Sequence, residues 1–329
     1  HFVYLKNKTG GYLFIIDLGQ PLAPQGPFDV IVHKLSDVIV ESEHDQQSKH
    51  LLANFQSYVL AHPGTVLLDP LPAMTRLLDR FTSYQIMSKL HKSLRGVPTS
   101  RYCFSVRLPF NITNYNTFVF PPVCKTRVAH GSLSHEMCLI FSAGGLPDVR
   151  PPCVLQSFVS HGAVLHKVFV VGDRHFCVER PSLKNFPSGP CDRKTIFFNS
   201  HEVSKPESSS HLTALDEQTP SLPPPSSEAM AALVQELRVQ LGMALFGVDV
   251  IIDIRTHTLT AIDINIFPGY EGVPQFFPSL LDHIKKVLDQ RAIGIACVWQ
   301  NSLVLLLSVW GAHWCGLTWH QLELINNLD

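Results

Sequence analysis

Two apolar segments joined by a short polar turn constrain the fold more than any other part of the chain. Residues 245–253 read LFGVDVIID and residues 260–267 read TAIDINIF. Side chains on a strand alternate between its two faces, so Asp263 and Asn265 share one face of the second segment. A turn midway between the segments places Asp249 opposite Asp263. The pattern therefore predicts a buried β-hairpin on which two carboxylates face each other.

The opposed carboxylates indicate a site for a cation. Directly opposed strand residues have Cβ atoms ~4.5–5.5 Å apart, and two negative charges at that distance repel by about 3 kcal/mol at an effective dielectric of about 20. Oxygen ligands from Asp249, Asp263 and Asn265 suit Mg²⁺, which phosphate oxygens commonly complete. The alternative left open by the pattern is that one aspartate is solvated at the sheet edge and the other caps a turn. The glycines of FPGYEG, residues 267–272, favour a ligand, because they let the backbone approach it closely.

Two lysines in apolar strands add positive charge that could meet phosphates. Lys125 lies in CKTRVAHGSLSHE, residues 124–136, and Lys167 lies in QSFVSHGAVLHKVFVV, residues 156–171. A lysine among apolar neighbours must extend to water or pair with an anion. Each lysine alone is weak evidence, because a lysine on a strand lies on a solvated face more often than it binds a ligand. Together with the hairpin and the glycine-rich turn, they outline a nucleoside triphosphate site, although the chain has neither the P-loop motif nor the G-x-G-x-x-G motif.

The rest of the chain alternates between strands and helices in its first third and becomes rich in strands after residue 119. Gly172 and Asp173, between two apolar runs, predict a tight hairpin. Ser227 is the expected N-cap of a helix that ends near Gly242. The periodicity predicts strands at 12–18, 28–35 and 65–70, and helices at 46–62, 71–94 (one or two) and 226–243.

Composition excludes some classes of protein. The 329 residues carry a net charge of −1, so the chain has no overall affinity for a polyanion, and we expect no nucleic-acid partner. The eight cysteines form no C-x-x-C pair, which argues against a zinc site and is ordinary for reduced thiols. The length allows about two domains. We expect a cytoplasmic monomer.

Several ordered motifs resemble the inositol 1,3,4-trisphosphate 5/6-kinase family, also called the inositol-tetrakisphosphate 1-kinases. They are DVIVHKLSDVI, CKTRVAHGSLSHEM, QSFVSHGAVLHKVFVVGD, RPSLKNF, FFNSHEVSKPESSS and the hairpin with AIDINIFPGYEGVPQFF. The resemblance covers residues 21–94 and 120–290. It implies an α/β (α+β) protein with the ATP-grasp fold, in which two sheet-containing domains hold the nucleotide. The implied domains are an N-terminal inositol-phosphate-binding domain at 1–94, ATP-grasp subdomains at 95–156 and 157–291, and a divergent apolar tail at 292–329.

The resemblance also implies a role for individual residues. Lys167 and Asp263 would be catalytic. Metal ligands would be Asp249, Asp263 and Asn265. Nucleotide contacts would come from Arg80, Lys125, Gln156, Ser157, Phe158, Val159, Lys167, Ser182, Ser200 and Ser204. Contacts to the inositol phosphate would come from Lys34, His135, Lys167, Asn265 and Gly269.

The implied function is an ATP-dependent kinase that uses two Mg²⁺ ions and phosphorylates a free hydroxyl of inositol polyphosphates. The acceptors would be inositol 1,3,4-trisphosphate at position 5 or 6 and inositol 3,4,5,6-tetrakisphosphate at position 1. Residues 1–11 do not match the strand and helix, with a substrate-binding lysine, that begin the family pattern, so the N-terminal domain looks incomplete. The alternative is therefore a protein that binds inositol phosphate and nucleotide with little or no catalysis. An ATP-grasp carboxylate–amine ligase is a third possibility that the motifs disfavour.

The C-terminal tail resembles nothing in the family. It has no Asp, Glu, Lys or Arg from 292 to 322, which is longer than the ~20 residues needed to cross a bilayer. Gln300, Asn301 and His313 interrupt its apolar character, so we expect a segment that does not span a membrane.

Overall fold

The computed structural model describes residues 3–6, 12–93, 106–107, 120–131, 133–214 and 222–291. The chain divides into two compact units, residues 1–280 and residues 281–329. Residues 281–291 of the second unit are helical. The predicted apolar tail lies outside the described residues, as does most of 95–118. Among the described residues, no helix is both long and apolar enough to span a bilayer.

A small sheet begins the first unit. Its strand order is β2-β1-β3-β4, and β3 pairs with β4 in parallel through a crossover that contains α1 and α2. Phe55 of α2 is fully buried against Ile31 and Leu35. Asp45 caps α2 by accepting a hydrogen bond from the Ser48 amide at 2.6 Å. The bounds are β1 Val3–Lys6, β2 Tyr12–Ile15, β3 Val30–Val32, α1 Ser36–Glu41, α2 Gln46–Ala61 and β4 Val66–Leu68, with a 3₁₀ turn, η1, at Ala23–Gln25.

The N-terminal prediction needs one correction. Residues 3–6 form β1, the strand between β2 and β3, although the sequence analysis assigned no strand there. An apolar run this short has too few residues to show an alternation of period two, and its pairing with β2 and β3 depends on distant residues.

The predicted helical region at 71–94 is two helices, α3 (Leu71–Leu78) and α4 (Arg80–Ser93). Asp79 between them has extended backbone angles and forms an isolated β-bridge with Val128. The Arg80 amide donates to the Arg127 carbonyl at 2.9 Å. The first turn of α4 is therefore fastened to the sheet that carries Lys125.

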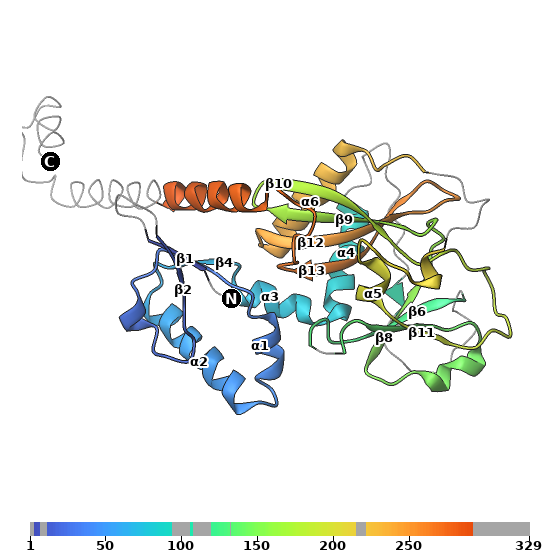
Figure 1. Ribbon diagram of the computed structural model, residues 1–329, viewed down its shortest axis with the longest axis horizontal. Helices are drawn as coiled ribbons and strands as arrows, with labels where there is room; N and C mark the ends of the chain where they lie inside the picture. Colours follow the sequence, from blue (N-terminus) through green and yellow to red (C-terminus); the bar gives the residue numbers. More distant parts are fainter. Residues whose placement is uncertain are drawn as a thin grey trace, which may run out of the picture. The chain divides into compact units, whose positions relative to one another are not determined.

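A five-stranded antiparallel sheet has the order β11-β7-β6-β8-β5 and carries Lys125 on β6. Its strands β6, β8 and β11 are labelled in Figure 1. The helix α5 follows β11 directly, and Asn199 caps it by accepting from the amides of His201 and Glu202. The bounds are β5 Val106–Arg107, β6 Pro122–Thr126, β7 Glu136–Leu139, β8 Cys153–Ser157, β11 Ile196–Asn199 and α5 Ser200–Ser204, with 3₁₀ turns η3 at Ala143–Asp148 and η4 at His211–Thr213.

A second antiparallel sheet, in the order β10-β9-β12-β13, carries the predicted carboxylate hairpin. The tight hairpin at Gly172 is confirmed, and Gly172 has a φ of +61°. The C-terminal hairpin is also confirmed, with Asp249 directly opposite Asp263 and Gly247 opposite Asn265. The bounds are β9 Val164–Val171, β10 Arg174–Pro181, β12 Leu245–Ile252 and β13 Leu259–Ile266.

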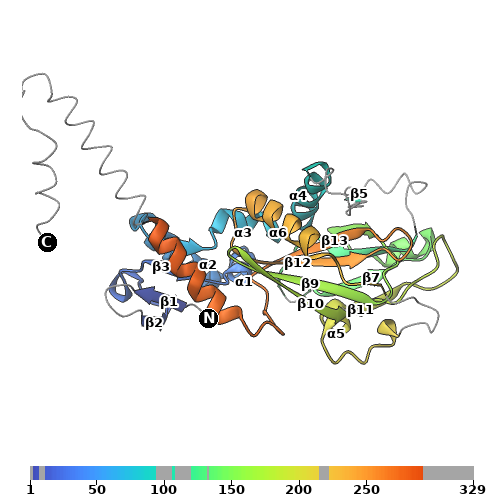
Figure 2. The ribbon, with the colours of Figure 1, turned by 90° about the horizontal axis from the view of Figure 1, so that it is seen from above.

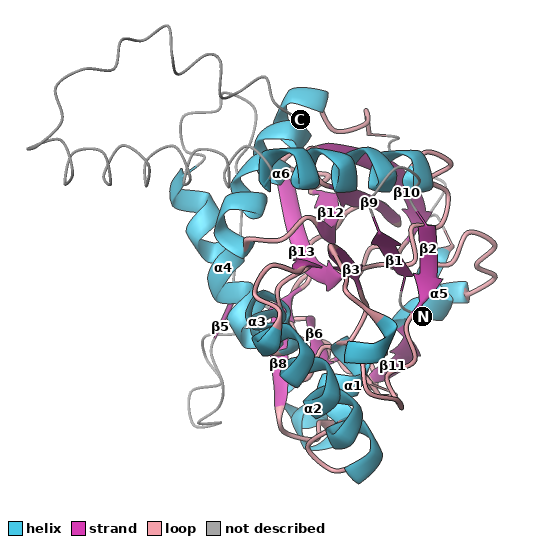
Figure 3. Ribbon diagram, turned by 90° about the vertical axis from the view of Figure 1, so that its left-hand side faces the viewer, coloured by secondary structure: helices cyan, strands magenta, loops and turns pink. Residues whose placement is uncertain are grey.

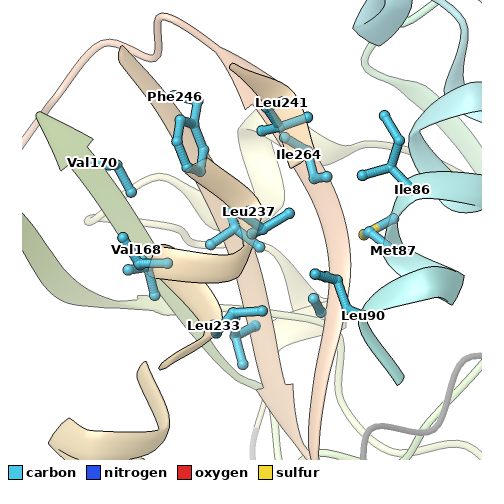
Figure 4. Packing of buried hydrophobic residues seen from close by; sticks show 14 of the residues in the cluster. Ile86, Met87, Leu90, Val168, Val170, Leu233, Leu237, Leu241, Phe246 and Ile264 are labelled. Atoms are coloured by element: carbon cyan, nitrogen blue, oxygen red, sulfur yellow. The ribbon is translucent and has the colours of Figure 1, made fainter. Parts of the chain in front are cut away.

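The helix α6, Ser227–Leu241, covers this second sheet (Figure 3). Figure 2 shows α4 and α6 on the same side of the sheet. Leu233 and Leu237 of α6 are fully buried and pack against Val168 and Phe246 of the sheet (Figure 4). The N-cap is Ser226 rather than the predicted Ser227, because Ser226 Oγ accepts from the Ala229 amide at 3.1 Å.

Candidate functional site

The predicted site residues line one cavity of about 690 Å³ in the first unit. Its walls come from both antiparallel sheets, from α1 and from the first turn of α4. The structure thus brings together residues that the sequence separates by more than two hundred positions. Their chemical roles stay predictions. The predicted residues that line the cavity are Lys34, Arg80, Lys125, His135, Gln156, Ser157, Phe158, Val159, Lys167, Ser182, Ser200, Ser204, Asp249, Asp263, Asn265 and Gly269.

Three charged residues form a row across adjacent strands at the floor of the cavity. Lys167 of β9 is the register partner of Asp249 of β12, which is opposite Asp263 of β13. Lys167 Nζ lies 3.5 Å from Asp249 Oδ2. This pairing explains why a lysine occurs in the middle of an apolar strand.

Asp263 is the most strongly held carboxylate of the site. Arg80 Nη1 lies 2.7 Å and Lys125 Nζ lies 3.5 Å from Asp263 Oδ2. Burial raises the pKa of Asp263, but the charges of Arg80 and Lys125 outweigh burial, and the pKa lies below its usual value. The carboxylate is therefore ionised at neutral pH.

The protein's own cations offset the repulsion between the two aspartates. From the sequence alone, a metal ion is the cation expected between them, because the pattern identifies no side chain that pairs with either carboxylate. In the structure each carboxylate has a cationic partner from a different element. The fact that Asp249 lies opposite Asp263 therefore does not by itself require a metal. Among the described residues, no group of three or more His, Cys, Asp or Glu side chains has a metal-binding arrangement.

The remaining oxygens nevertheless suit Mg²⁺. The Asp249 Oδ1 atom and the side-chain amide of Asn265 make no hydrogen bond within the described part of the chain. Both residues line the cavity. Two carboxylates and an amide carbonyl are hard oxygen donors, as Mg²⁺ prefers. The donor chemistry of Asp249, Asp263 and Asn265 fits the predicted metal.

Lys125 is a buried cation held by several groups. Its Nζ donates to the Ile262 carbonyl at 3.0 Å and lies 5.8 Å from the centre of the Tyr84 ring. Burial lowers the pKa of Lys125, but Asp263 and Tyr84 more than offset burial, and the pKa is raised. Gln156 Nε2 donates to the same Ile262 carbonyl at 3.2 Å. Both side chains are thus fixed to β13 beside Asp263.

His161 is a site residue that the sequence analysis missed. It is buried, with Nδ1 2.7 Å from the Val159 carbonyl and Nε2 2.7 Å from Ser182 Oγ. Burial lowers its pKa to about 4, against the opposing effect of the Val159 carbonyl. The neutral ring therefore donates from Nδ1 to Val159 and accepts from the Ser182 hydroxyl, which fixes two predicted nucleotide contacts.

Two of the predicted inositol-phosphate residues, His135 and Lys34, come from outside the strands of the row. His135 Nδ1 is 3.3 Å from Ser200 Oγ, and its ring centre is 5.8 Å from that of His201. Burial is the main reason that the pKa of His135 is lowered, and His201, Arg80 and Lys167 lower it further. Lys34 enters the cavity from the segment before α1.

The glycine-rich turn after β13 is held by an arginine that sequence reasoning also missed. Arg180 Nη2 of β10 donates to the Glu271 carbonyl at 2.9 Å. The Tyr270 hydroxyl donates to the Val170 carbonyl at 2.8 Å. These contacts position Gly269 at the cavity. No charge pattern in the sequence predicts this contact of Arg180, because its partner is a backbone carbonyl far along the chain.

Two family models match the chain. The model for the inositol 1,3,4-trisphosphate 5/6-kinase ATP-grasp domain matches residues 105–286, and the model for the pre-ATP-grasp domain of the same kinase matches residues 1–74. The second match includes the N-terminal segment that looked incomplete from its sequence.

Curated relatives agree with the family models. The chain is 49% identical to an inositol-tetrakisphosphate 1-kinase of Danio rerio over 310 residues, which are 90% of this chain and 77% of the relative. It is 48% identical to the Xenopus laevis enzyme of the same name, over 88% of this chain and 75% of the relative. It is 34% identical to inositol-tetrakisphosphate 1-kinase 3 of Glycine max, over 82% of this chain and 75% of the relative. The chain belongs to the inositol 1,3,4-trisphosphate 5/6-kinase family and is an inositol polyphosphate kinase with the ATP-grasp fold.

Proposed function

We propose that the protein transfers the γ-phosphoryl group of ATP to inositol 1,3,4-trisphosphate at position 5 or 6 and to inositol 3,4,5,6-tetrakisphosphate at position 1. The observation that carries this proposal is the row Lys167–Asp249–Asp263, which shares one cavity with Lys34 and His135. The row supplies one lysine and two carboxylates, which together with Mg²⁺ would hold a triphosphate, and Lys34 and His135 would supply donors for a phosphorylated acceptor. The family name prints inositol 1,3,4-trisphosphate and positions 5/6, and the relatives' name prints an inositol tetrakisphosphate and position 1. The 3,4,5,6 isomer is the expectation from the resemblance.

The nucleotide would lie between the two antiparallel sheets. Lys125 and Lys167 would pair with its phosphates, and Arg80 would join them while it fixes Asp263. The backbone from Gln156 to Val159, with Ser182 held by His161, would contact the base and the sugar. Ser200 and Ser204 would contact the nucleotide from α5, Ser204 through its hydroxyl oxygen, because its hydrogen is donated to the Ser200 carbonyl at 2.6 Å. The phosphate contacts are charge-assisted hydrogen bonds, each stronger than its neutral equivalent.

Asp249, Asp263 and Asn265 would hold two Mg²⁺ ions. When bound, Mg²⁺ supplies positive charge to the phosphate oxygens on which negative charge develops during transfer. The Asp263 carboxylate needs no proton removed to bind it, because its pKa is held below the usual value.

Phosphoryl transfer requires mainly positioning and electrostatic stabilisation from the protein. Lys34, His135, Asn265 and Gly269 would seat the inositol phosphate so that its free hydroxyl lies in line with the γ-phosphate. Lys167 lies beside Asp249 and would offset charge on the transferred group. Lys167 and Asn265 would thus lie where the nucleotide and the acceptor meet.

The experiment is a transfer assay with labelled ATP, Mg²⁺ and a panel of inositol phosphates, with product isomers resolved by chromatography. We expect a labelled tetrakisphosphate from inositol 1,3,4-trisphosphate and a labelled pentakisphosphate from inositol 3,4,5,6-tetrakisphosphate. Binding of both ligands without a labelled product would instead support the non-catalytic alternative. A monomeric state and a cytoplasmic location remain predictions.

A further inference from the structure

Asp37 and His130 form a contact that the proposed reaction leaves without a role. Asp37 lies in the first turn of α1, and His130 lies in the loop between β6 and β7. Asp37 Oδ1 is 3.6 Å from His130 Nδ1, and both residues line the cavity. The imidazole is 16% exposed, whereas the carboxylate is 53% exposed. The contact therefore joins a half-buried imidazole in the cavity wall to an acid on a different element.

The surroundings of Asp37 hold its carboxylate in the ionised form. A hydrogen bond to His130 is the main reason that the pKa of Asp37 is lowered, and burial opposes it. The Gly131 amide and the charge of Lys34 lower the pKa further. Val40, one turn after Asp37, also lies against Gly131, within 4.0 Å of where a Cβ would stand. Helix α1 is thus anchored to the loop that carries His130.

The other ring nitrogen of His130 is available to a ligand. Nδ1 faces Asp37, and within the described residues Nε2 has no hydrogen-bond partner. Lys34, His135 and Lys167 line the same cavity, which is therefore rich in groups that bind phosphate. An imidazole held at Nδ1 can donate from Nε2 to a phosphate oxygen when it is protonated.

We infer that Asp37 is a positioning residue for the acceptor: it holds the His130 ring so that Nε2 donates to a phosphate of the inositol polyphosphate. The inference rests on the proposed function, since it concerns the acceptor of that reaction. It gives the Asp37 carboxylate a favourable effect on acceptor binding, although a negative charge ordinarily repels a polyanionic ligand.

Whether removal of the Asp37 carboxylate weakens or tightens acceptor binding distinguishes a positioning role from simple charge repulsion. A carboxylate near a phosphate site repels the ligand, so its removal alone would tighten binding of the acceptor. If Asp37 positions His130, its removal weakens binding instead. The expected loss is that of one charge-assisted hydrogen bond, roughly tenfold in affinity.

The test is the steady-state kinetics of Asp37→Asn with inositol 3,4,5,6-tetrakisphosphate and Mg-ATP. We expect KM for the inositol phosphate to rise roughly tenfold, while KM for ATP and kcat change by less than about twofold, because the lost contact is equal in ground state and transition state. Calorimetric titration of the same inositol phosphate without ATP should show the same loss of affinity. Asp37→Glu, which keeps the carboxylate, should recover part of it.

A double-mutant cycle with His130→Phe ties the effect to the pair. If Asp37 acts through His130, adding Asp37→Asn to His130→Phe should cause no further loss. Glu43→Gln, just after α1, removes an exposed carboxylate outside the cavity and is the control for charge on this segment. An unchanged or lower KM in Asp37→Asn, or additive effects in the cycle, would overturn the inference while the kinase assignment stands. A wild-type protein that neither binds nor phosphorylates inositol phosphates would overturn the proposed function, and this inference with it.

Discussion

Arg80 Nη1 lies 2.7 Å from Asp263 Oδ2, and this ion pair joins the first turn of α4 to β13 across the floor of the cavity. Both side chains are buried, with 5% and 12% exposed. Arg80 Nη2 also donates to the Ser134 carbonyl at 2.8 Å, so one guanidinium connects three segments of the chain. A lysine could not do this, because it lacks the planar fork of donors. The pair therefore has a structural effect in addition to its proposed place in the nucleotide site.

Replacing Asp263 should affect activity and stability differently in two variants. Asp263→Asn keeps the shape and one oxygen, and we expect kcat to fall by about two orders of magnitude or more from lost electrostatic stabilisation. Both variants leave Arg80 and Lys125 buried without an anion, so both should unfold more easily. Asp263→Ala should lose ~3–5 kcal/mol, and Asp263→Asn less, because its oxygen can still accept from Arg80. Kinase assays and urea unfolding measure the two effects.

The control for this pair of variants is Asp289→Asn, which makes the same chemical change at an exposed position outside the cavity. It should match the wild type in both measurements. Normal phosphorylation of inositol trisphosphate by Asp263→Asn would contradict the assignment of Asp263 to the catalytic site.

His161 should make the protein less stable in acid. Its pKa is about 4 in the folded protein, whereas an unfolded histidine titrates near 6.5. As pH falls through 6.5 the unfolded state takes up a proton that the folded state refuses until pH 4, so the free energy of unfolding falls by roughly 1.4 kcal/mol per pH unit in this window. Urea unfolding at pH 7, 6 and 5 should show a shallower fall for His161→Gln than for the wild type.

Other buried groups titrate in the same window and set the background for this comparison, among them His33 and Asp69. Burial lowers the pKa of His33 to about 4, which adds to the loss in acid, and burial raises the pKa of Asp69 to about 6, which opposes it as pH falls from 6 to about 4. Both are unchanged in the variant, so the difference between the two profiles reports His161. The exposed His44→Gln is the matched control, and equal slopes for His161→Gln and the wild type would contradict the prediction.

The sequence predicts the hairpin well because its register depends on local rules. Alternation with a period of two and one short turn are enough to oppose Asp249 and Asp263, and the structure shows this register. Lys167 could also be singled out, since a cation within an apolar strand needs a partner. Its partner, Asp249, could not be identified, because the pairing of β9 with β12 brings together segments about eighty residues apart.

Other parts of the site could not be found from local patterns. Arg80 entered the predicted site only through the family resemblance, because its place beside Asp263 depends on how α4 is fastened to the sheet. The neighbouring sequence does not predict a role in the site for His161, Arg180 or Asp37. Each of them contacts a residue of another element. The predicted N-cap of α6 was wrong by one residue. Ser226 and Ser227 are chemically equivalent, and only the backbone angles decide which of them lies outside the helix.

Gly272 should be required for the shape of the turn after β13. Its φ is +78°, and an added Cβ would lie 3.3 Å from Arg180 Nη2. We expect Gly272→Ala to reduce stability by about 1–2 kcal/mol from backbone strain. KM for the inositol phosphate should rise as well, because Arg180 and Gly269 depend on this turn. Gly144→Ala is the control, since an added Cβ there meets only Ser142 Oγ at an ordinary 3.6 Å, and equal thermal midpoints for the two variants would count against strain at Gly272.

Mutations can distinguish the role of Asp249 as a predicted metal ligand from the role of Lys167, which pairs with it. Asp249→Asn replaces a carboxylate by a weaker oxygen ligand, so we expect the Mg²⁺ concentration for half-maximal rate to rise by about tenfold or more. Lys167→Met leaves both carboxylates in place but removes a charge proposed to contact phosphate, so it should lower kcat even at saturating Mg²⁺ without raising the Mg²⁺ requirement. Rates measured against Mg²⁺ at fixed ATP, after removal of metal with EDTA, distinguish the two. If Asp249→Asn had the wild-type Mg²⁺ dependence, Asp249 would serve only as the counter-ion of Lys167, and the metal site would have to lie elsewhere.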